Sequence, residues 1–299
     1  MRLRLQSAME YLLTYGWALL IIVIVIVALF QLGLFNSSNI ASRAIAGACE
    51  AVHNAAGSSL AGQCTNEIPQ FVAQFNGASS SISTGYQQTS VISYTITAWV
   101  MTTSAGANPV FQDRGSGAGT SFTLEIGYNG GQSSHPGTIN CGVDSNGIWI
   151  GGYTSATVND GKWHFIACTL SETSGNPITS SAIATYMDGV FAPMSTAQIG
   201  SATSPISGLG PAIIGYHQSW NNYFNGQISN VQIYNTSLSA SEINTLYQEG
   251  IGSAPIDPSH IVGWWPLNGN ANDYSGNNNN GVPISISYNG TWTSRYTVP

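Results

Sequence analysis

Apolar residues follow one another almost without interruption from Leu12 to Phe30, where only Thr14 and Gly16 break the run. A helix of about nineteen residues rises about 28 Å, close to the roughly 30 Å of a bilayer's hydrocarbon core. The pattern therefore predicts a membrane-length helix near the start of the chain.

The basic residues around this run predict its orientation. Arg2 and Arg4 precede it, and the next basic residue is Arg43. Because positive charge is retained on the cytoplasmic side of a membrane, we expect everything after Phe35 to lie outside the cell.

From Phe71 onward the pattern changes to a period of two, which is typical of strands. Between Tyr94 and Val100, Ile96 and Ala98 fall on one face and Thr97 and Trp99 on the other. Further β-rich runs are Trp163–Leu170, Ile183–Met187 and Gln227–Tyr234, with predicted turns at Asp188-Gly189 and Asn225-Gly226. Many short strands with glycine-rich turns predict a β-sandwich.

One short helix is predicted after these strands. Ser239 is a good N-cap, and Glu242 three positions later completes a capping box. Ile243, Leu246 and Tyr247 then fall on one helical face, which we expect to pack against the sandwich.

The composition limits the partners. Only 6% of the residues are charged, against roughly 25% in a typical soluble domain, and the net charge is −7. Nucleic-acid binding is excluded as a function, because phosphate backbones require clustered cations.

Four cysteines are present in the segment expected outside the cell, where disulfides persist. They allow three pairings, of which we favour Cys49 with Cys64 and Cys141 with Cys168. Free buried thiols are the alternative.

The triplets beginning at Asn36, Asn235 and Asn289 fit the glycosylation acceptor pattern.

The polar residues ahead of the apolar run carry a recognisable spacing. The sequence Gln6-Ser7-Ala8-Met9-Glu10 resembles the class III signal peptides of archaeal type IV pilin-like proteins, in which a prepilin peptidase cuts before a Gln and a Glu stands fifth in the mature chain. Leu5 and Ala8 depart from the residues usual at their positions. The apolar helix would remain on the mature protein.

This resemblance implies a filament. A carboxylate near lipid is costly unless it is paired, so Glu10 would need a partner such as the amino terminus of a neighbouring subunit. The implied partners are other copies of the chain through the helix, the prepilin peptidase and pilus assembly machinery, and the membrane before assembly. A plain signal anchor is the alternative.

The β-rich part is similar to the laminin-G-like branch of the concanavalin A-like jelly rolls. The matching segments are Phe75-Asn76-Gly77, Ile96–Val100, Gly161–His164, Tyr186–Gly189, Ile214-Gly215 and the continuous block Tyr223–Tyr247. The resemblance implies a mainly β fold, with a hydrophobic α-helix followed by an antiparallel sandwich.

The C-terminal segment 261–292 resembles the opening strand and loop of this family, which in relatives precedes the Phe75-Asn76-Gly77 strand. We therefore expect a circularly permuted domain whose last strand returns to its own sandwich. Donation to a neighbouring subunit is the alternative. The expected divisions are leader 1–5, helix 6–36, linker with a disulfide 37–70, and jelly roll 71–299.

Two candidate binding sites follow. Asp273, Asn277 and Asn279 offer oxygen ligands in a loop near which relatives often hold calcium, although a merely polar turn is the alternative. Ser229 and Asn230 stand where relatives often have acidic residues, which removes charge from such a site.

Trp220, Asn222 and Tyr223 offer aromatic faces and an amide for a surface glycan. Packing of Trp220 and Tyr223 onto the sandwich is the alternative.

The sequence argues against an enzyme. Glycoside hydrolases need two carboxylates about 5 to 10 Å apart, whereas Glu125, Glu172 and Asp160 stand alone and Asp188 lies in a turn. The histidines show no metal-ligand spacing, and packing is the better explanation for His164.

The predicted function is a pilus-like filament subunit at the cell surface, with its lectin-like domain exposed for adhesion or carbohydrate binding. The alternatives are a monomeric membrane-anchored lectin or solute-binding protein, and a surface glycoside hydrolase.

Overall fold

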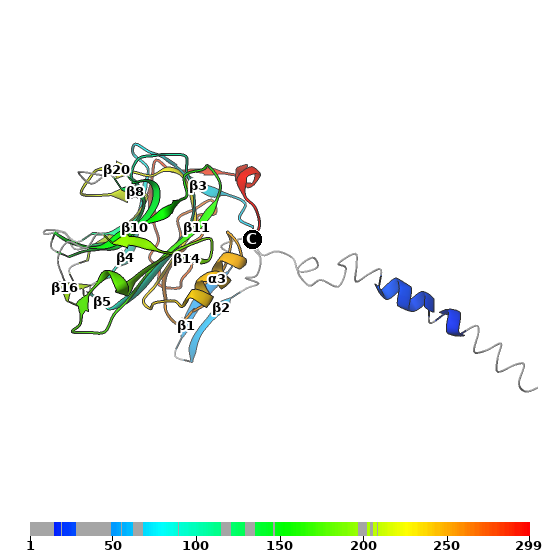
Figure 1. The fold of residues 1–299 in the computed structure, drawn as a ribbon. Helices are drawn as coiled ribbons and strands as arrows, with labels where there is room; N and C mark the ends of the chain where they lie inside the picture. The colour runs from blue at the N-terminus through cyan, green and yellow to red at the C-terminus, as the bar shows by residue number, and fades with distance from the viewer. Residues whose placement is uncertain are drawn as a thin grey trace, which may run out of the picture. The chain divides into compact units, whose positions relative to one another are not determined.

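A computed structural model describes residues 15–18, 20–27, 49–54, 56–61, 68–88, 90–114, 121–128, 135–145, 147–196, 202–203, 206–207 and 209–299 (Figure 1). The chain divides into two compact units, Met1–Ser42 and Arg43–Pro299.

In the first unit, residues 15–18 and 20–27 are helical, and their apolar side chains are exposed, from 44% at Ile26 to 65% at Tyr15. None of the helices within the described residues is long and apolar enough to cross a membrane. The predicted processing residues Leu5, Gln6 and Glu10 lie outside the described residues, as does Asn36.

The second unit is an antiparallel sandwich of two sheets. The front sheet has the strand order β15 (Met194–Thr196), β10 (Ile148–Thr157), β9 (His135–Ser145), β8 (Ser121–Tyr128), β7 (Asn108–Asp113), β18 (Pro211–Ile214), β4 (Ser81–Gln87) and β23 (Val282–Ile284).

The back sheet has the order β14 (Val190–Ala192), β13 (Ile183–Met187), β11 (His164–Ser171), β6 (Ser93–Met101), β21 (Asn225–Tyr234), β3 (Val72–Asn76) and β24 (Ser287–Asn289), with β22 (Ile261–Trp265) also paired to β21. The predicted strands are confirmed.

Smaller elements complete the described part of the chain. Two-stranded pairs are β1 (Glu50–Asn54) with β2 (Gly57–Ala61), β12 (Pro177–Ile178) with β16 (Ala202–Thr203), β17 (Ile206–Ser207) with β5 (Ser90–Val91), and β19 (Tyr216–His217) with β20 (Asn222–Tyr223). The helical elements of the sandwich unit are α3 (Ala240–Gln248), η1 (Ser180–Ala182) and η2 (Trp292–Arg295).

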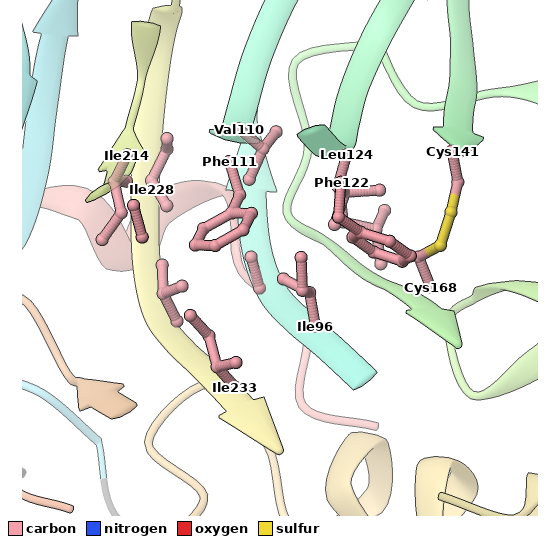
Figure 2. Packing of buried hydrophobic residues seen from close by; sticks show 14 of the residues in the cluster. Ile96, Val110, Phe111, Phe122, Leu124, Cys141, Cys168, Ile214, Ile228 and Ile233 are labelled. Carbon is pink, nitrogen blue, oxygen red and sulfur yellow. A yellow bond between two sulfur atoms is a disulfide. The ribbon is translucent and has the colours of Figure 1, made fainter. Parts of the chain in front are cut away.

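The main core fills the space between the two sheets. Figure 2 shows Ile96 and Ile233 of the back sheet near Phe111 and Phe122 of the front sheet, all buried. A disulfide joins Cys141 on β9 to Cys168 on β11, with 6.2 Å between the two α-carbons, and so links the sheets. This predicted pairing is confirmed.

A second apolar cluster covers the outer side of the back sheet. Trp99, Phe165 and Trp264 pack there against Ile243 and Leu246 of α3. The helix begins at the predicted capping box, in which Ser239 Oγ accepts from the backbone N–H of Glu242 and the Glu242 carboxylate accepts from that of Ser239. The back sheet is therefore buried on both faces, which explains why β6 is buried almost throughout.

The C-terminal segment returns to the sandwich of its own chain. β22 pairs with β21, β23 with β4 and β24 with β3. Trp265 enters the main core and Trp264 the second cluster, as expected for neighbours in a strand.

The hairpin of β1 and β2 belongs to the same compact unit as the sandwich, although residues 37–70 were expected to form a linker. The backbone N–H of Ala51 donates to the carbonyl of Tyr274 at 2.8 Å, and His53 Nε2 lies 2.7 Å from the carbonyl of Ser275. Figure 1 shows this hairpin near α3. Cys49 is buried and disulfide-bonded, whereas Cys64 lies outside the described residues.

One predicted turn is wrong. Asn225 and Gly226 form the start of β21 and pair with Asn76 and Phe75 of β3. Gly226 has a φ of +148°, and a β-carbon there would lie 2.2 Å from the carbonyl oxygen of Met101, so this close approach requires glycine.

Candidate functional site

A cavity of about 160 Å³ lies on the outer face of the front sheet. Its lining residues come from β8, β9, β10, β19, the residue after β7 and the connection after β19: Arg114, Ser121, Thr123, Glu125, Asp144, Trp149, His217, Ser219 and Trp220. The cavity is smaller than the roughly 300 to 1,000 Å³ typical of drug-sized ligand sites, which suits one small ligand unit.

Strand alternation on β8 creates the floor of this cavity. Phe122, Leu124 and Ile126 belong to the main core. The residues between them, Thr123 and Glu125, must then face outward, because successive side chains in a strand point to opposite faces.

Glycines on β9 and β10 leave room for one wall. Gly142 pairs with Gly151 across the two strands. A β-carbon on Gly142 would lie 2.7 Å from Cζ2 of Trp149, so the indole lies directly over this glycine. The glycine pair therefore sets the position of the Trp149 ring at the cavity.

The opposite wall is held by a side-chain amide on β7. Gln112 Oε1 accepts from the backbone N–H of Gln218 at 2.9 Å, and Gln112 Nε2 lies 3.0 Å from His217 Nε2. The His217 ring stacks on Trp220, with ring centroids 4.2 Å apart and planes 6° from parallel. Trp220 is 43% exposed, so part of its ring remains accessible to a ligand.

Glu125 is a buried carboxyl group with one satisfied oxygen. Its Oε1 accepts from Asn140 Nδ2 at 2.6 Å, whereas Oε2 has no hydrogen-bond partner among the described residues. Burial raises the pKa of Glu125 to about 8, against the smaller lowering effect of the Asn140 hydrogen bond. The carboxyl group is therefore neutral at pH 7.

His217 is also buried and neutral. Burial, with the charge of Arg114, lowers the pKa of His217 to about 4. Because Gln112 Nε2 donates to His217 Nε2, the ring proton resides on Nδ1. Within the described residues, Nδ1 has no partner.

A charged pair lies at the rim. Arg114 Nη1 is 3.9 Å from Asp144 Oδ2, and both side chains are partly exposed. Asp144 Oδ1 accepts from the backbone N–H of Gly147 at 2.8 Å. This bond fixes the carboxylate to the turn between β9 and β10.

Comparison with known families assigns the fold. Residues 76–244 match the family described as the concanavalin A-like lectin/glucanases superfamily. The chain belongs to this superfamily. No curated protein matches the chain in a sequence search.

Solved structures are also similar to this chain. A candidate carbohydrate-binding protein from Bacteroides ovatus is 16% identical, with a TM-score of 0.53, and the alignment covers 75% of this chain and 60% of that protein. A pentraxin from Limulus polyphemus is 14% identical, with a TM-score of 0.47, and the alignment covers 73% of this chain and 94% of the pentraxin. At 16% identity, the likeness to the Bacteroides ovatus protein shows the fold alone.

Of the three residues predicted to bind a glycan, one lies at the cavity. Trp220 lines it, whereas Asn222 and Tyr223 do not. Tyr223 stacks on Tyr216, with centroids 4.6 Å apart, and ligand binding by Asn222 and Tyr223 stays a prediction. The sequence analysis missed Trp149 and His217 as cavity residues and treated Glu125 as isolated.

The predicted calcium residues are used within their own loop. Asp273 Oδ1 accepts from the backbone N–H groups of Trp264 and Ser275, and Oδ2 accepts from Asn279 N and Ser275 Oγ. Asn277 and Asn279 donate their side-chain N–H groups to the carbonyl of Val262, at 3.3 and 2.8 Å. These bonds fix the loop to β22, and calcium binding stays a prediction.

Asp160, which was expected to stand alone, and the turn residue Asp188 meet at one histidine. His164 Nδ1 lies 2.8 Å from Asp188 Oδ2, and His164 Nε2 lies 3.1 Å from Asp160 Oδ1. The packing interpretation holds for Trp163, which is buried, but is wrong for His164. In the described part of the chain, no three His, Cys, Asp or Glu residues are placed to hold a metal ion.

The remaining glycosylation candidates differ in exposure. Asn235 is exposed directly after β21, and Asn289 is half-buried in β24. Asn289 Oδ1 accepts from the backbone N–H of Thr291 at 2.9 Å. Glycosylation of either residue stays a prediction.

Proposed function

We propose that the chain is an extracellular carbohydrate-binding protein and that the cavity between Trp149 and Trp220 is its sugar site. The observation that carries this proposal is the pair of unpartnered buried atoms, Glu125 Oε2 and His217 Nδ1, at a cavity flanked by indole rings. Leaving buried polar atoms unpaired costs about 1 to 3 kcal/mol each, which a polar ligand relieves. Indole rings supply apolar faces for a sugar ring.

Binding is favoured over hydrolysis by the placement of the two carboxyl groups. On the front sheet, Glu125 pairs with Asn140, whereas Asp144 pairs with Ser121. Four residues along β9 separate these positions, or about 13 Å of strand. This backbone spacing exceeds the roughly 5 to 10 Å that separates the two carboxyl groups of a glycoside hydrolase, although both side chains line the cavity.

Trp220→Ala and Trp149→Ala are each expected to weaken glycan binding at least tenfold, or about 1.4 kcal/mol. Each substitution removes one apolar wall while leaving the polar floor. Isothermal titration calorimetry, with a glycan first found by array screening of the full chain, measures the effect.

Phe191→Ala is the matched control, because Phe191 is an exposed aromatic residue on β14, away from the cavity. Its affinity should equal that of the wild type. Equal affinities for all three variants and the wild type would place the sugar site elsewhere.

We also propose that the first unit assembles copies of the chain into a type IV pilus-like filament at the cell surface. Support comes from the spacing of Gln6 and Glu10 and from the exposed apolar side chains of residues 20–27. Exposed apolar surface of this extent is typical of an interaction site. A monomeric anchored lectin is the competing arrangement.

Mass spectrometry of the N-terminal peptide, taken from material sheared off intact cells, distinguishes these arrangements. The filament proposal expects a mature chain beginning at Gln6. An intact Met1, recovered only with membranes, would contradict processing and favour the anchored monomer.

A further inference from the structure

We propose that the cavity binds an acidic sugar, taking its carboxylate through hydrogen bonds donated by the protonated Glu125 carboxyl group and by His217. This inference rests on the proposed carbohydrate-binding function and adds the chemical class of the ligand. It also predicts that binding requires the proton on the Glu125 carboxyl group.

The hydrogen bond from Asn140 determines which oxygen of Glu125 carries the proton. Asn140 donates to Oε1, so the proton of the neutral carboxyl group resides on Oε2, the oxygen without a described partner. The pKa of about 8 keeps that proton in place at pH 7. A ligand atom that meets Oε2 must then be an acceptor.

His217 contributes a second unpartnered donor. Its Nε2 accepts from Gln112, which leaves Nδ1 as an N–H group. The orientation of the Gln112 amide is fixed independently, because its Oε1 accepts from the backbone N–H of Gln218. Both buried unpartnered atoms at this cavity are thus donors.

The remaining polar groups do not offset this excess of donors. Asp144 would be the strongest acceptor, but its two oxygens face the Gly147 N–H and the Arg114 guanidinium. The hydroxyl groups of Ser121 and Thr123 lie 3.4 Å apart and can rotate to donate. A carboxylate, which only accepts, satisfies this set better than hydroxyl groups do.

The charged and titratable groups facing Glu125 come from three elements. Arg114 follows β7, Asp144 belongs to β9, and His217 lies on β19. Tyr153 on β10, which pairs with Asn140, and His135 stacked on Tyr153 lie on the neighbouring part of the sheet. Among the described residues that line the cavity, Arg114 is the cation that a ligand carboxylate meets, and deprotonating Glu125 would set two carboxylates against each other.

The expected signature is an affinity that depends on pH and on ligand charge. Between pH 6 and 7.5, Glu125 is protonated and the ligand is ionised, so binding is strong. Above the pKa of Glu125, affinity should fall about tenfold per pH unit, because one proton must be retained for binding.

Calorimetry on the full chain tests this with oligosaccharides of galacturonate, glucuronate, mannuronate and guluronate, each compared with its methyl ester and with its neutral sugar. At pH 7 at least one acidic member should bind tenfold or more tightly than both of its uncharged counterparts. Its affinity should fall by at least tenfold between pH 7 and pH 9.5.

Glu125→Gln identifies the group responsible. The amide still accepts from Asn140 and still donates, but it has no proton to lose, so the fall between pH 7 and pH 9.5 should disappear. Glu125→Ala, which lacks the donor, should weaken binding of the acidic sugar at pH 7. Glu172→Gln, the same change outside the cavity, should keep the wild-type pH profile.

Neutral sugars that bind as well as their acidic counterparts, or an affinity that does not change with pH, would overturn the acidic-sugar inference while leaving the carbohydrate-binding function standing. The same holds if Glu125→Gln retains the wild-type fall in affinity. Absence of binding to acidic and neutral sugars alike would overturn both.

Discussion

Removal of residues 257–299 is expected to unfold the sandwich. The segment supplies β22, β23 and β24, which pair with three different strands, and it places the fully buried Trp264 and Trp265 in the two apolar clusters. Loss of one buried tryptophan typically costs about 3 to 5 kcal/mol, against about 5 to 15 kcal/mol for the whole stability of a domain. Circular dichroism with urea denaturation measures the loss.

A permuted chain provides the control. Trp292 Nε1 donates to the carbonyl of Pro69 at 3.1 Å, and Asn289 pairs with Val72. Residues 257–295 joined by a short linker to residues 68–256 should therefore fold cooperatively. Cooperative unfolding of the truncated chain, or failure of the permuted chain to fold, would contradict the view that this segment is the displaced first strand of the domain.

The stability of the protein is expected to fall as the pH rises from about 4.5 to about 8, and Glu125 should cause much of this fall. A carboxyl group whose pKa is raised by folding binds its proton more tightly in the folded state. Its contribution to the free energy of unfolding is complete below about pH 4.5 and is lost as the pH passes through 8. The shift corresponds to at most about 5 kcal/mol.

Two other buried groups also change the free energy of unfolding with pH. Burial also raises the pKa of Asp113, so Asp113 acts in the same direction. The lowered pKa of His217 acts in the opposite direction, because its contribution is present above about pH 6.5 and is lost as the pH falls through 4. Between about pH 4 and 6.5, the contribution of His217 therefore offsets only part of the fall in stability that Glu125 and Asp113 cause.

Urea denaturation at pH 5 and pH 8 tests the assignment. The difference in unfolding free energy between the two pH values should be smaller in Glu125→Gln than in the wild type, since the amide cannot ionise. Glu172→Gln should reproduce the wild-type difference. Equal differences in all three proteins would show that Glu125 does not carry the pH dependence.

The elements predicted from sequence were those set by local pattern. Alternation in the segment 94–100 predicted β6, and the Ser239 capping box predicted the start of α3. The pairing of Cys141 with Cys168 was instead a choice among three possible pairings, which local pattern does not decide. The strand and the helix start depend on side-chain period or residue type near one position, which the sequence displays directly.

The cavity could not be predicted in the same way, because it depends on which strands become neighbours. His217 and Trp220 reach Glu125 only because β18 returns beside β7 and β8 lies next to β7. One signal was nevertheless present. Alternation along β8 places Glu125 outward between apolar neighbours, and the glycines of β9 and β10 indicate space beside it.

The central claim, that the cavity between Trp149 and Trp220 binds a sugar, is tested most directly by nuclear magnetic resonance of the indole N–H groups. The chain has eight tryptophans, which report on the cavity, the core and the outer cluster separately. Titration with the bound glycan should shift the Trp149 and Trp220 signals and leave those of Trp99, Trp264 and Trp265 unchanged. Binding without a shift at either cavity indole would contradict the account.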